Sequence, residues 1–270
     1  MAWLDTGAEV SPGFHRWLKK RDVKIINYNV DDPFGTRDGK KWSQYIKSVP
    51  YHDITAVVRV DNIDEAKAAG ANNVIHVYRS YDPVAHAPVV PTAEEQKKWA
   101  SDVCFIGTWM PERGPFMVRL LELGVPLTIR GNRWQHAPEW TSIKTAWKGP
   151  AVYDREYRLA LQCSRVTLGL LSKGNRDLHT TRSAEVPFMG GAVFCAERTV
   201  EHQEMFVEGK EVEFWSSPKE CAEKCFRILK DEEKRQNFAK SAKAKVEVLG
   251  LSNDKVMQRI INSLSLSSLS

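Results

Sequence analysis

Short apolar segments that alternate with amphipathic segments are the feature that most constrains the fold of this sequence. Residues 23–28, 54–59 and 74–78 are apolar, and stretches with helical periodicity separate them. Apolar runs of roughly four to eight residues are typical of strands buried on both faces of a sheet. Strands that alternate with helices indicate a parallel sheet. We therefore expect residues 1–80 to form strand–helix units of a parallel α/β domain.

A proline-containing segment interrupts this alternation. Residues 79–92, RSYDPVAHAPVVPT, contain three prolines and no periodicity, which is typical of a connector between domains. The alternation resumes after it, with strands expected at residues 103–106, 127–130, 166–171 and 192–195. The sequence thus predicts an α/β protein with two Rossmann-like parallel-sheet domains that face a cleft.

The predicted boundaries follow from this pattern. Residues 1–92 are expected to form an N-terminal domain with the connector, and residues 93–252 a C-terminal, ligand-binding domain. Residues 253–270 form a C-terminal helix and a frayed, serine-rich tail. Ligands of open parallel sheets bind beyond the carboxyl ends of the strands, so side chains that follow a strand are the first candidates for a site.

Composition and charge exclude several classes of protein. The sequence is 42% hydrophobic and 27% charged, as in ordinary globular proteins, and it has no apolar run of the about 18 residues that a transmembrane helix needs. Its start, MAWLDTGAEVSPG, lacks the features of a signal peptide, so we expect a cytoplasmic protein. The net charge of +5 is spread among interspersed acids and bases, which disfavours nucleic acid as a partner and is compatible with anionic substrates.

The five cysteines are expected to be reduced and mostly buried. Cys221 and Cys225 lie four residues apart on a predicted helix, at a spacing that a zinc pair can have. Such a site needs two further ligands, and the sequence pattern offers none. We therefore expect no bound metal.

The first candidate site follows the predicted strand at residues 103–106. Gly107 ends this strand, and a glycine there lets a ligand approach the backbone. Arg113 stands where the next helix begins and would give a fixed charge for a phosphate. The alternative is an ordinary turn with a solvated arginine.

The second candidate site follows the predicted strand at residues 166–171. Lys173, Arg176 and Arg182 could flank a diphosphate, next to a helix N-terminus that Thr180 or Thr181 would cap. The alternative is a salt-bridged surface loop, which is less favoured because the segment follows a continuous apolar strand.

Two acids in the same segment are eight residues apart. Asp177 and Glu185 are natural partners for the hydroxyls of a sugar or a ribose. In the N-terminal part, Asp31 and Asp32 also follow a strand, but Asp-Asp-Pro is ordinary turn chemistry and no third acid supports a metal site. His202 is interpreted as structural rather than catalytic.

An ordered pattern over residues 168–220 resembles a known family. It contains Asn-Arg-Asp, His-Thr, Arg, Glu-Val-Pro, Gly-Gly, Glu-Arg-Thr and Glu-His in this order, and VDDPF follows a strand in the N-terminal part. Over residues 2–262 the sequence resembles CgeB-type proteins, often labelled spore maturation proteins, which are similar to retaining glycosyltransferases of the GT-B fold. The resemblance implies transfer of a sugar from a nucleoside diphosphate sugar to an unknown acceptor, with retention and without a metal cofactor.

The resemblance also implies roles for residues. Arg113 occupies the place of a basic residue that contacts the diphosphate, and Thr108 stands where an arginine is frequent. Glu185 would hold the ribose, with Asp177 in the place of the first acid of the donor site. Expected catalytic residues are Arg113, Arg182 and Asp177. Expected donor-binding residues are Gly107, Lys173, Asn175, His179, Thr181, Glu185, Gly190, Gly191 and Glu197.

One departure from the family pattern leaves alternatives open. The chain begins with what resembles a strand and loop from the middle of the first domain, so on the order of 80 residues of that domain are expected to be absent, and a partner would cover the exposed part. A non-catalytic factor that binds a nucleotide sugar or a glycan in spore or cell-surface assembly is the main alternative. A sugar-nucleotide epimerase is a third hypothesis.

Overall fold

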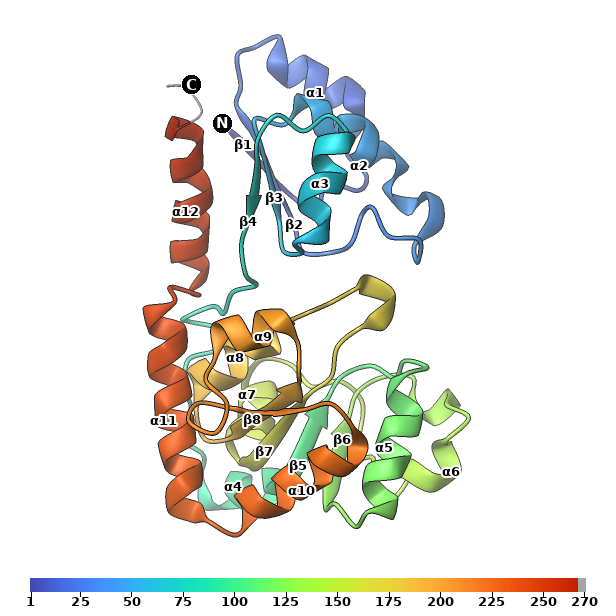
Figure 1. Cartoon of the computed structure of the whole chain (residues 1–270), viewed down its shortest axis with the longest axis vertical. Helices are drawn as coiled ribbons and strands as arrows, with labels where there is room; N and C mark the ends of the chain where they lie inside the picture. Colours follow the sequence, from blue (N-terminus) through green and yellow to red (C-terminus); the bar gives the residue numbers. More distant parts are fainter. Residues whose placement is uncertain (267–270) are drawn as a thin grey trace. The chain divides into compact units, whose positions relative to one another are not determined.

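The fold is known from a computed structural model that describes residues 1–266, with side chains described up to residue 264. The predicted frayed tail lies in part at residues 267–270, outside the described residues. The described chain divides into two compact units, each built on its own sheet (Figure 1). The predicted class, α/β with two parallel sheets, is confirmed.

Unit 1 contains a four-stranded parallel sheet in the order β1-β2-β3-β4. Its core contains Ile26, Ile54 and Ala56 of the central strands, and Val256 and Ile260 come from the last helix of the chain. The elements of unit 1 are β1 (Ala2–Asp5), α1 (Pro12–Lys19), β2 (Ile25–Asn29), α2 (Ser43–Ser48), β3 (Ile54–Val57), α3 (Asp61–Ala68), β4 (Val74–His76) and α12 (Asn253–Leu266).

Unit 2 contains a five-stranded parallel sheet in the order β6-β5-β7-β8-β9. The chain runs from β5 outward to β6 and then returns to the other side of β5 as β7. The order in which strands are added to the sheet therefore reverses between β5 and β7. Its strands are β5 (Ser101–Ile106), β6 (Leu127–Arg130), β7 (Ser164–Gly169), β8 (Val193–Glu197) and β9 (Glu213–Trp215). In open α/β sheets, such a switch point is where ligands bind.

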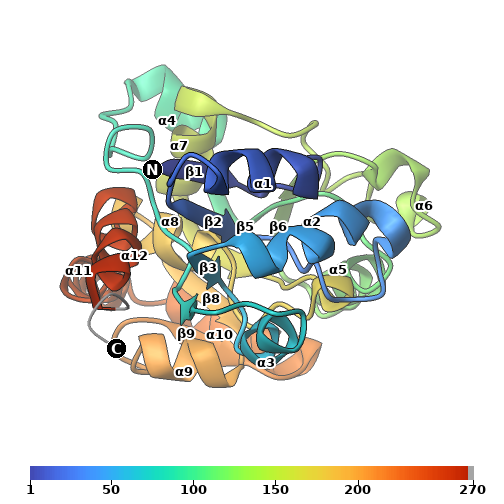
Figure 2. The same cartoon turned by 90° about the horizontal axis from the view of Figure 1, so that it is seen from above.

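Helices connect the strands of unit 2 (Figure 1; Figure 2 shows the same chain from above). They are α4 (Ala93–Trp99), α5 (Arg113–Glu122), α6 (Trp140–Ile143), α7 (Asp154–Gln162), α8 (Arg182–Met189), α9 (Val200–Met205), α10 (Pro218–Leu229) and α11 (Glu232–Val248). Local chemistry explains their starts. Thr92 and Glu95 form a reciprocal capping box at α4, and Ser217 accepts a hydrogen bond from the Glu220 amide at the start of α10.

The boundaries of the two units differ from the predicted domains. Unit 1 consists of residues 1–79, 172–177 and 253–270, and unit 2 consists of residues 80–171 and 178–252. The proline-containing segment after Arg79 therefore belongs to unit 2, because Tyr81 stacks on Phe188 and its amide donates to the Leu251 carbonyl. The segment 172–177 belongs to unit 1 although it follows a strand of unit 2.

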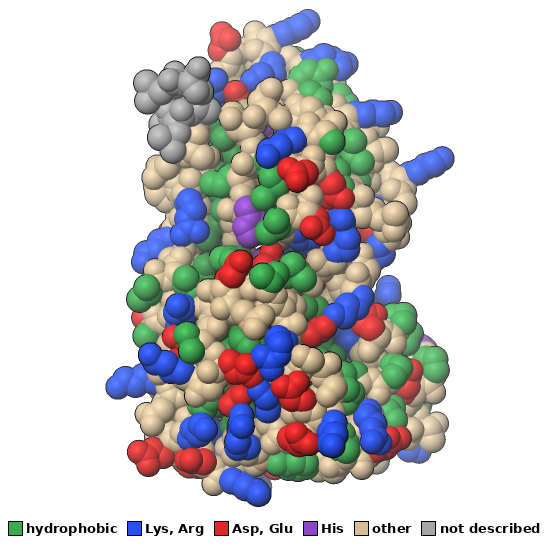
Figure 3. Space-filling view, in the orientation of Figure 1, with side chains coloured by type: hydrophobic (Ala, Val, Ile, Leu, Met, Phe, Trp, Pro, Cys, Tyr) green, Lys and Arg blue, Asp and Glu red, His purple; other side chains and the backbone are tan. Residues whose placement is uncertain are grey.

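Charge and hydropathy follow the pattern expected from the sequence. On the face shown in Figure 3, basic and acidic side chains are interspersed. Within residues 1–266, no helix combines the length and the apolar character needed to cross a bilayer.

Candidate functional site

A cavity of about 330 Å³ lies in unit 2 at the switch point of the sheet. Its volume is at the lower end of the range found for small-molecule sites, roughly 300–1,000 Å³. The end of β5 and the start of α8 supply two of its walls. The lining residues from these elements are Ile106, Gly107, Thr108, Thr181, Arg182 and Glu185.

The wall at the end of β5 depends on glycines. Gly131 has φ +146°, and a Cβ placed on it would lie 2.0 Å from the carbonyl oxygen of Gly107. The same carbonyl accepts a hydrogen bond from Trp134 Nε1 at 2.8 Å. Only glycine at position 131 allows this close approach of the two loops, which fixes the backbone of Gly107 at the cavity.

Arg113 lies at the first position of α5, next to this wall. Its side chain is buried, Nη1 donates to the Thr108 carbonyl at 2.8 Å, and Nη2 lies 3.4 Å from the Leu170 carbonyl. The guanidinium thus joins the loops that follow β5 and β7. Arg113 is not among the residues that line the cavity, and in this structure it holds the backbone of the neighbouring Thr108.

Arg182 lines the cavity from the first turn of α8. Among the side chains described, up to residue 264, its Nε is buried and has no hydrogen-bond partner. A buried N–H without a partner costs about 1–3 kcal/mol, and an anionic ligand in the cavity would remove this cost. The helix N-terminus adds its positive dipole at the same place. Thr181 precedes Arg182 at the N-cap position, but its side chain makes no capping hydrogen bond, contrary to the sequence prediction.

Glu185 follows one turn later and is largely buried. Its Oε2 accepts a hydrogen bond of 2.5 Å from the Tyr157 hydroxyl, and its Oε1 lies 3.5 Å from His86 Nε2. Burial raises the pKa of Tyr157, so the phenol stays protonated and acts as a donor. Carboxylate oxygens held in this way can accept hydrogen bonds from the hydroxyls of a bound sugar or ribose.

A buried histidine fixes the start of α8. His202 Nδ1 lies 2.7 Å from the Glu197 carbonyl and therefore carries the proton, and Nε2 accepts from the Ser183 hydroxyl at 2.8 Å. Burial lowers the pKa of His202 to about 4, so the ring is neutral at physiological pH. The structural role predicted for His202 agrees with these contacts.

His179 and Glu197 support this region without lining the cavity. His179 Nδ1 lies 2.5 Å from a carboxylate oxygen of Glu201, and both side chains are almost fully buried. Glu197 ends β8 and supplies the carbonyl that His202 contacts. The prediction that both bind the donor stays a prediction.

Three predicted site residues belong to unit 1 rather than to the cavity of unit 2. Asp177 is buried and ion-paired with Arg59 and with Arg79, the latter at 3.2 Å. Asn175 offers its carbonyl to Arg59 Nε at 2.6 Å, and Lys173 lies in the same segment. Lys173, Asn175 and Asp177 thus belong to unit 1, whereas Arg182 and Glu185 belong to unit 2.

Arg176 is also engaged within unit 1. It makes two hydrogen bonds to the carboxylate of Asp32 at 2.7 and 2.8 Å and two more to Glu65 at 2.9 Å. Asp32 in addition accepts from the Gly35 amide, as the turn interpretation of the Asp-Asp-Pro segment requires. These contacts make Arg176 and Asp177 members of ion pairs, as in the alternative left open by the sequence.

Gly190 and Gly191 lie at the other end of α8 from Arg182, about 12 Å along the helix axis. Both have positive φ, and a Cβ on Gly191 would lie 2.6 Å from the Gln162 carbonyl. Gly190 is the C-cap residue of α8, which matches the alternative of a helix end rather than a nucleotide-lining turn.

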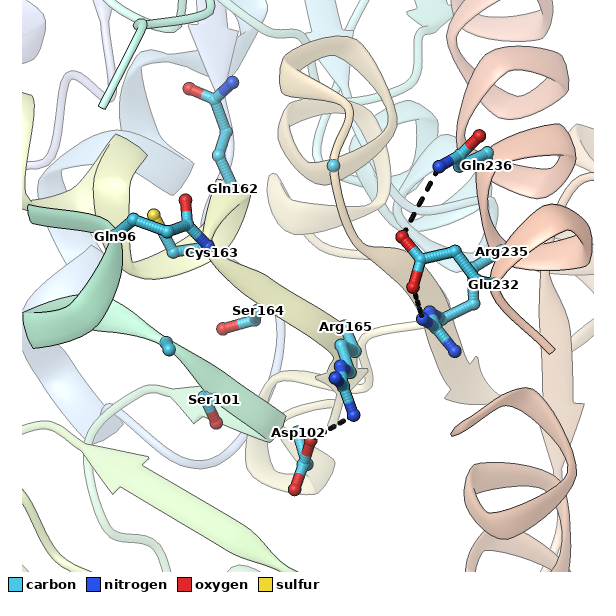
Figure 4. A pocket seen from close by; sticks show the side chains of 12 residues that line it. Gln96, Ser101, Asp102, Gln162, Cys163, Ser164, Arg165, Glu232, Arg235 and Gln236 are labelled. Atoms are coloured by element: carbon cyan, nitrogen blue, oxygen red, sulfur yellow. Dashed lines mark hydrogen bonds and ion pairs between the residues drawn. The ribbon is translucent and has the colours of Figure 1, made fainter. Parts of the chain in front are cut away.

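Gly191 instead borders a second hollow, of about 450 Å³, at the amino ends of β5 and β7 (Figure 4). Its arginines are satisfied within the protein: Arg165 pairs with Asp102 at 2.9 Å and Arg235 with Glu232 at 2.8 Å. This hollow therefore lacks the unpartnered cationic donor that marks the cavity at the opposite edge of the sheet.

Sequence analysis missed Tyr157 and His86. Tyr157 lies on α7 and His86 in the proline-containing segment, so both are distant in sequence from Glu185. A tyrosine between the polar and the apolar face of a helix fits the ordinary hydrophobic periodicity. The sequence pattern therefore does not mark it as a site residue. Only the packing of α7 beside α8 brings it to the carboxylate.

Comparison with known proteins identifies the family of this chain. Residues 113–262, more than half of the chain, match the family described as glycosyl transferase-like. The chain belongs to the glycosyl transferase-like family. The matched region includes α8 and four of the residues that line the cavity, which are Tyr157, Thr181, Arg182 and Glu185. No curated protein matches the sequence.

Solved structures share the fold of this glycosyl transferase-like chain. Anabaena HepE in complex with UDP-glucose has 10% identity and a TM-score of 0.67, over 93% of this chain and 75% of that one. Sucrose-phosphate synthase of Thermosynechococcus elongatus has 11% identity and a TM-score of 0.66, over 96% and 72%. A protein described as a UDP-N-acetylglucosamine 2-epimerase of Listeria monocytogenes has 9% identity and a TM-score of 0.52, over 92% and 72%.

These comparisons confirm the GT-B type of fold that the sequence predicted. Together with the family, they support sugar transfer as the general chemistry of this glycosyl transferase-like protein. The likeness to the solved structures, at these identities, concerns the fold alone.

Proposed function

We propose that the protein transfers a sugar from a nucleoside diphosphate sugar to an acceptor, with retention, and that unit 2 holds the donor in the cavity at the switch point of its sheet. One observation carries this proposal. The cavity places a buried Arg182 Nε without a partner at the N-terminus of a helix, and this is the electrostatic arrangement that favours a phosphate.

The proposed orientation of the donor follows from charge. The diphosphate lies at Arg182 and the α8 N-terminus, and Glu185 accepts hydrogen bonds from ribose hydroxyls while Tyr157 and His86 hold its carboxylate. Arg113 stabilises the loop at Thr108 that borders the diphosphate. Catalysis is then mainly electrostatic, because fixed positive groups stabilise the charge that develops on the departing diphosphate. The leaving phosphate takes the proton of the acceptor, and we propose that no metal takes part.

The position of the reacting sugar is part of the same proposal. His179 and Glu197, which belong to the same unit as the cavity, are proposed to act on the donor or its sugar as the sequence pattern implies. Lys173, Asn175 and Asp177 belong to unit 1, where Arg59 contacts the latter two, and are not assigned to the donor. Within the family, we assign the chain to the CgeB type on its ordered motifs.

A cytoplasmic location is proposed from its five free, buried cysteines, which are typical of proteins kept in a reducing compartment.

Donor binding is tested by calorimetry with UDP, GDP, ADP and TDP and with their sugars. One nucleotide is expected to bind, and Glu185→Gln is expected to weaken it more than it weakens inorganic diphosphate, since the glutamate acts at the ribose. Glu156→Gln, an exposed acid on the neighbouring α7, is the matched control and should leave the affinity unchanged. Equal loss for nucleotide and diphosphate would contradict the orientation.

Turnover distinguishes the proposed enzyme from the alternatives. Slow hydrolysis of the matching nucleotide sugar is expected, with release of a sugar of the same anomeric configuration as the donor. Tight binding without hydrolysis or transfer would favour a non-catalytic binding factor. Recovery of an isomerised nucleotide sugar would favour an epimerase.

A further inference from the structure

Three of the five cysteines meet in the core of unit 2, outside the proposed donor site. Cys195 lies on the buried strand β8, and Cys221 and Cys225 lie on α10. All three are completely buried, and their sulfur atoms lie within 4.8 Å of one another. The other two cysteines, Cys104 and Cys163, are buried as well but do not belong to this group.

The local structure explains why the three sulfur atoms converge. A spacing of four residues puts Cys221 and Cys225 on the same face of α10. Cys195 is one of the β8 residues on the sheet face that shares a hydrophobic core with α10. The sequence analysis found no further ligand for a zinc pair on α10, and the third sulfur was missed because it comes from a strand 26 residues before Cys221.

The distances agree with the dimensions of a metal–thiolate group. A zinc–sulfur bond is about 2.3 Å long, so three sulfurs around one ion are separated by about 4 Å. The three sulfur atoms now lie within 4.8 Å of one another. Side-chain rotations that move each sulfur by less than about 1 Å would bring them to that separation.

We propose that Cys195, Cys221 and Cys225 form a buried site for a thiophilic d10 cation, held by three thiolates. Each sulfur that binds the ion releases its proton to solvent. A divalent ion leaves a net charge of −1 in apolar surroundings, and a monovalent ion leaves −2, so burial favours a divalent ion such as Zn²⁺. The bound ion would tie α10 to β8 and stabilise unit 2.

The test uses the whole, reduced chain without oxygen and Cd²⁺ as the spectroscopic probe. We expect one Cd²⁺ per chain, a thiolate-to-metal charge-transfer band in the ultraviolet, and a higher melting temperature. Because the site is buried, the ion is added both to the folded protein and during refolding. Parallel titrations with Zn²⁺ and with Cu⁺ distinguish a divalent from a monovalent occupant.

Matched variants give the decisive comparison. Cys195→Ala, Cys221→Ala and Cys225→Ala should each abolish the charge-transfer band, whereas Cys104→Ala and Cys163→Ala should retain it. If the first three variants do not fold, X-ray absorption of the Cd²⁺-bound wild-type chain must show three sulfur neighbours. Absence of stoichiometric binding in both protocols, retention of the band in Cys225→Ala, or fewer than three sulfur neighbours would overturn the proposal. None of these results depends on sugar transfer.

Discussion

At the scale of single residues, the guanidinium of Arg182 is the positive group on which the proposed phosphate site mainly depends. Among the described side chains of unit 2, its Nε is buried without a partner, as is that of Arg158, but Arg182 lines the cavity and Arg158 does not, whereas Arg165 and Arg198 pair with acids. Sequence analysis selected Arg182 because three basic residues follow an apolar strand. It could not separate Arg182 from Arg176, since their different partners are set by contacts between segments far apart in the sequence.

Removal of this side chain is the first prediction. Arg182→Ala is expected to weaken nucleoside diphosphate binding by about 1.5–3 kcal/mol, roughly ten- to a hundredfold, because a charged hydrogen-bond donor to the phosphate is lost. Calorimetry measures the change. Arg165→Ala, at the opposite edge of the same sheet, serves as the control with unchanged affinity, and an equal loss in both variants would remove Arg182 from the site.

The second prediction concerns the hydrogen bond from Tyr157 to Glu185. Tyr157→Phe leaves the buried carboxylate without this donor, which is expected to cost about 1–3 kcal/mol in the free energy of unfolding. Nucleotide affinity should also fall, because the carboxylate is no longer held. Urea unfolding and calorimetry measure the two effects. Tyr153→Phe, an exposed tyrosine of the same cavity, is the comparison, and unchanged stability in Tyr157→Phe would contradict the contact.

The third prediction is a pH dependence from His202. Its pKa is about 4 in the folded protein and 6.5 in the unfolded chain, so the unfolded chain binds more protons between these values. The free energy of unfolding is therefore expected to fall as the pH decreases through this window, by about 2 kcal/mol between pH 7 and pH 5, and this contribution levels off below the folded-state pKa. Above pH 6.5 the contribution of the neutral ring to stability is complete.

Urea unfolding at the two pH values measures this effect. His202→Asn is expected to be less stable at pH 7 but to lose less stability on acidification than the wild type. His52, whose pKa burial lowers to about 3, remains in both proteins and contributes equally. An identical pH dependence in the two proteins would show that His202 is not buried as a neutral ring.

At the scale of elements, the segment after β7 was predicted from the sequence to form one ligand-binding loop. In the structure it is divided between the two units. Residues 172–177 are held in unit 1 by Arg59 and Arg79, and the chain from Leu178 onward returns to unit 2, where Thr199 donates to the Leu178 carbonyl at 2.5 Å. The dense charge of the segment was visible in the sequence. Its division was not, because the arginines that pair with Asp177 come from the loops after β3 and β4.

The fourth prediction tests this division. Asp177→Ala is expected to reduce the free energy of unfolding by about 3–5 kcal/mol, because it leaves two buried guanidinium groups without their carboxylate. The double variant Arg59→Met with Asp177→Leu should recover part of the loss, since apolar side chains replace the pair. Urea unfolding measures both. A cost below about 1 kcal/mol for Asp177→Ala would mean that the ion pair is exposed to solvent.

A glycine pair gives the fifth prediction. Gly131→Ala is expected to destabilise the protein by more than about 2 kcal/mol and to weaken nucleotide binding, since the new methyl group collides with the Gly107 carbonyl at the cavity. Gly124→Ala, where φ is +81° and nothing lies within 4 Å, should cost only the backbone strain of about 1–2 kcal/mol and leave binding intact. Similar binding by both variants would separate Gly131 from the site.

At the scale of the whole molecule, the order of strands and helices was predictable because apolar runs and capping residues are local signals. Strands such as β5 and β7 and the start of α10 at Ser217 agree with the sequence prediction. The strand β9 and the helix α9 were missed because they are only three and six residues long, too short for a periodic pattern. Helix α12 was predicted, but its place in the core of unit 1, through Val256 and Ile260, depends on long-range packing.

At the same scale, unit 2 as a whole is proposed to bind a nucleoside diphosphate at the α8 N-terminus without a metal. The most direct measurement is a thermal-shift series with UDP, GDP, ADP and TDP and their sugars, in the presence of a chelator, on the wild type and on Arg182→Ala. At about a hundred times its dissociation constant, a ligand adds roughly 2.7 kcal/mol, which corresponds to several degrees for a chain of this size. We predict such a shift with one nucleotide family in the wild type and a shift reduced to about half or less in Arg182→Ala at the same ligand concentration. No shift with any nucleotide in a cooperatively melting wild-type protein, or an equal shift in the variant, would contradict the claim.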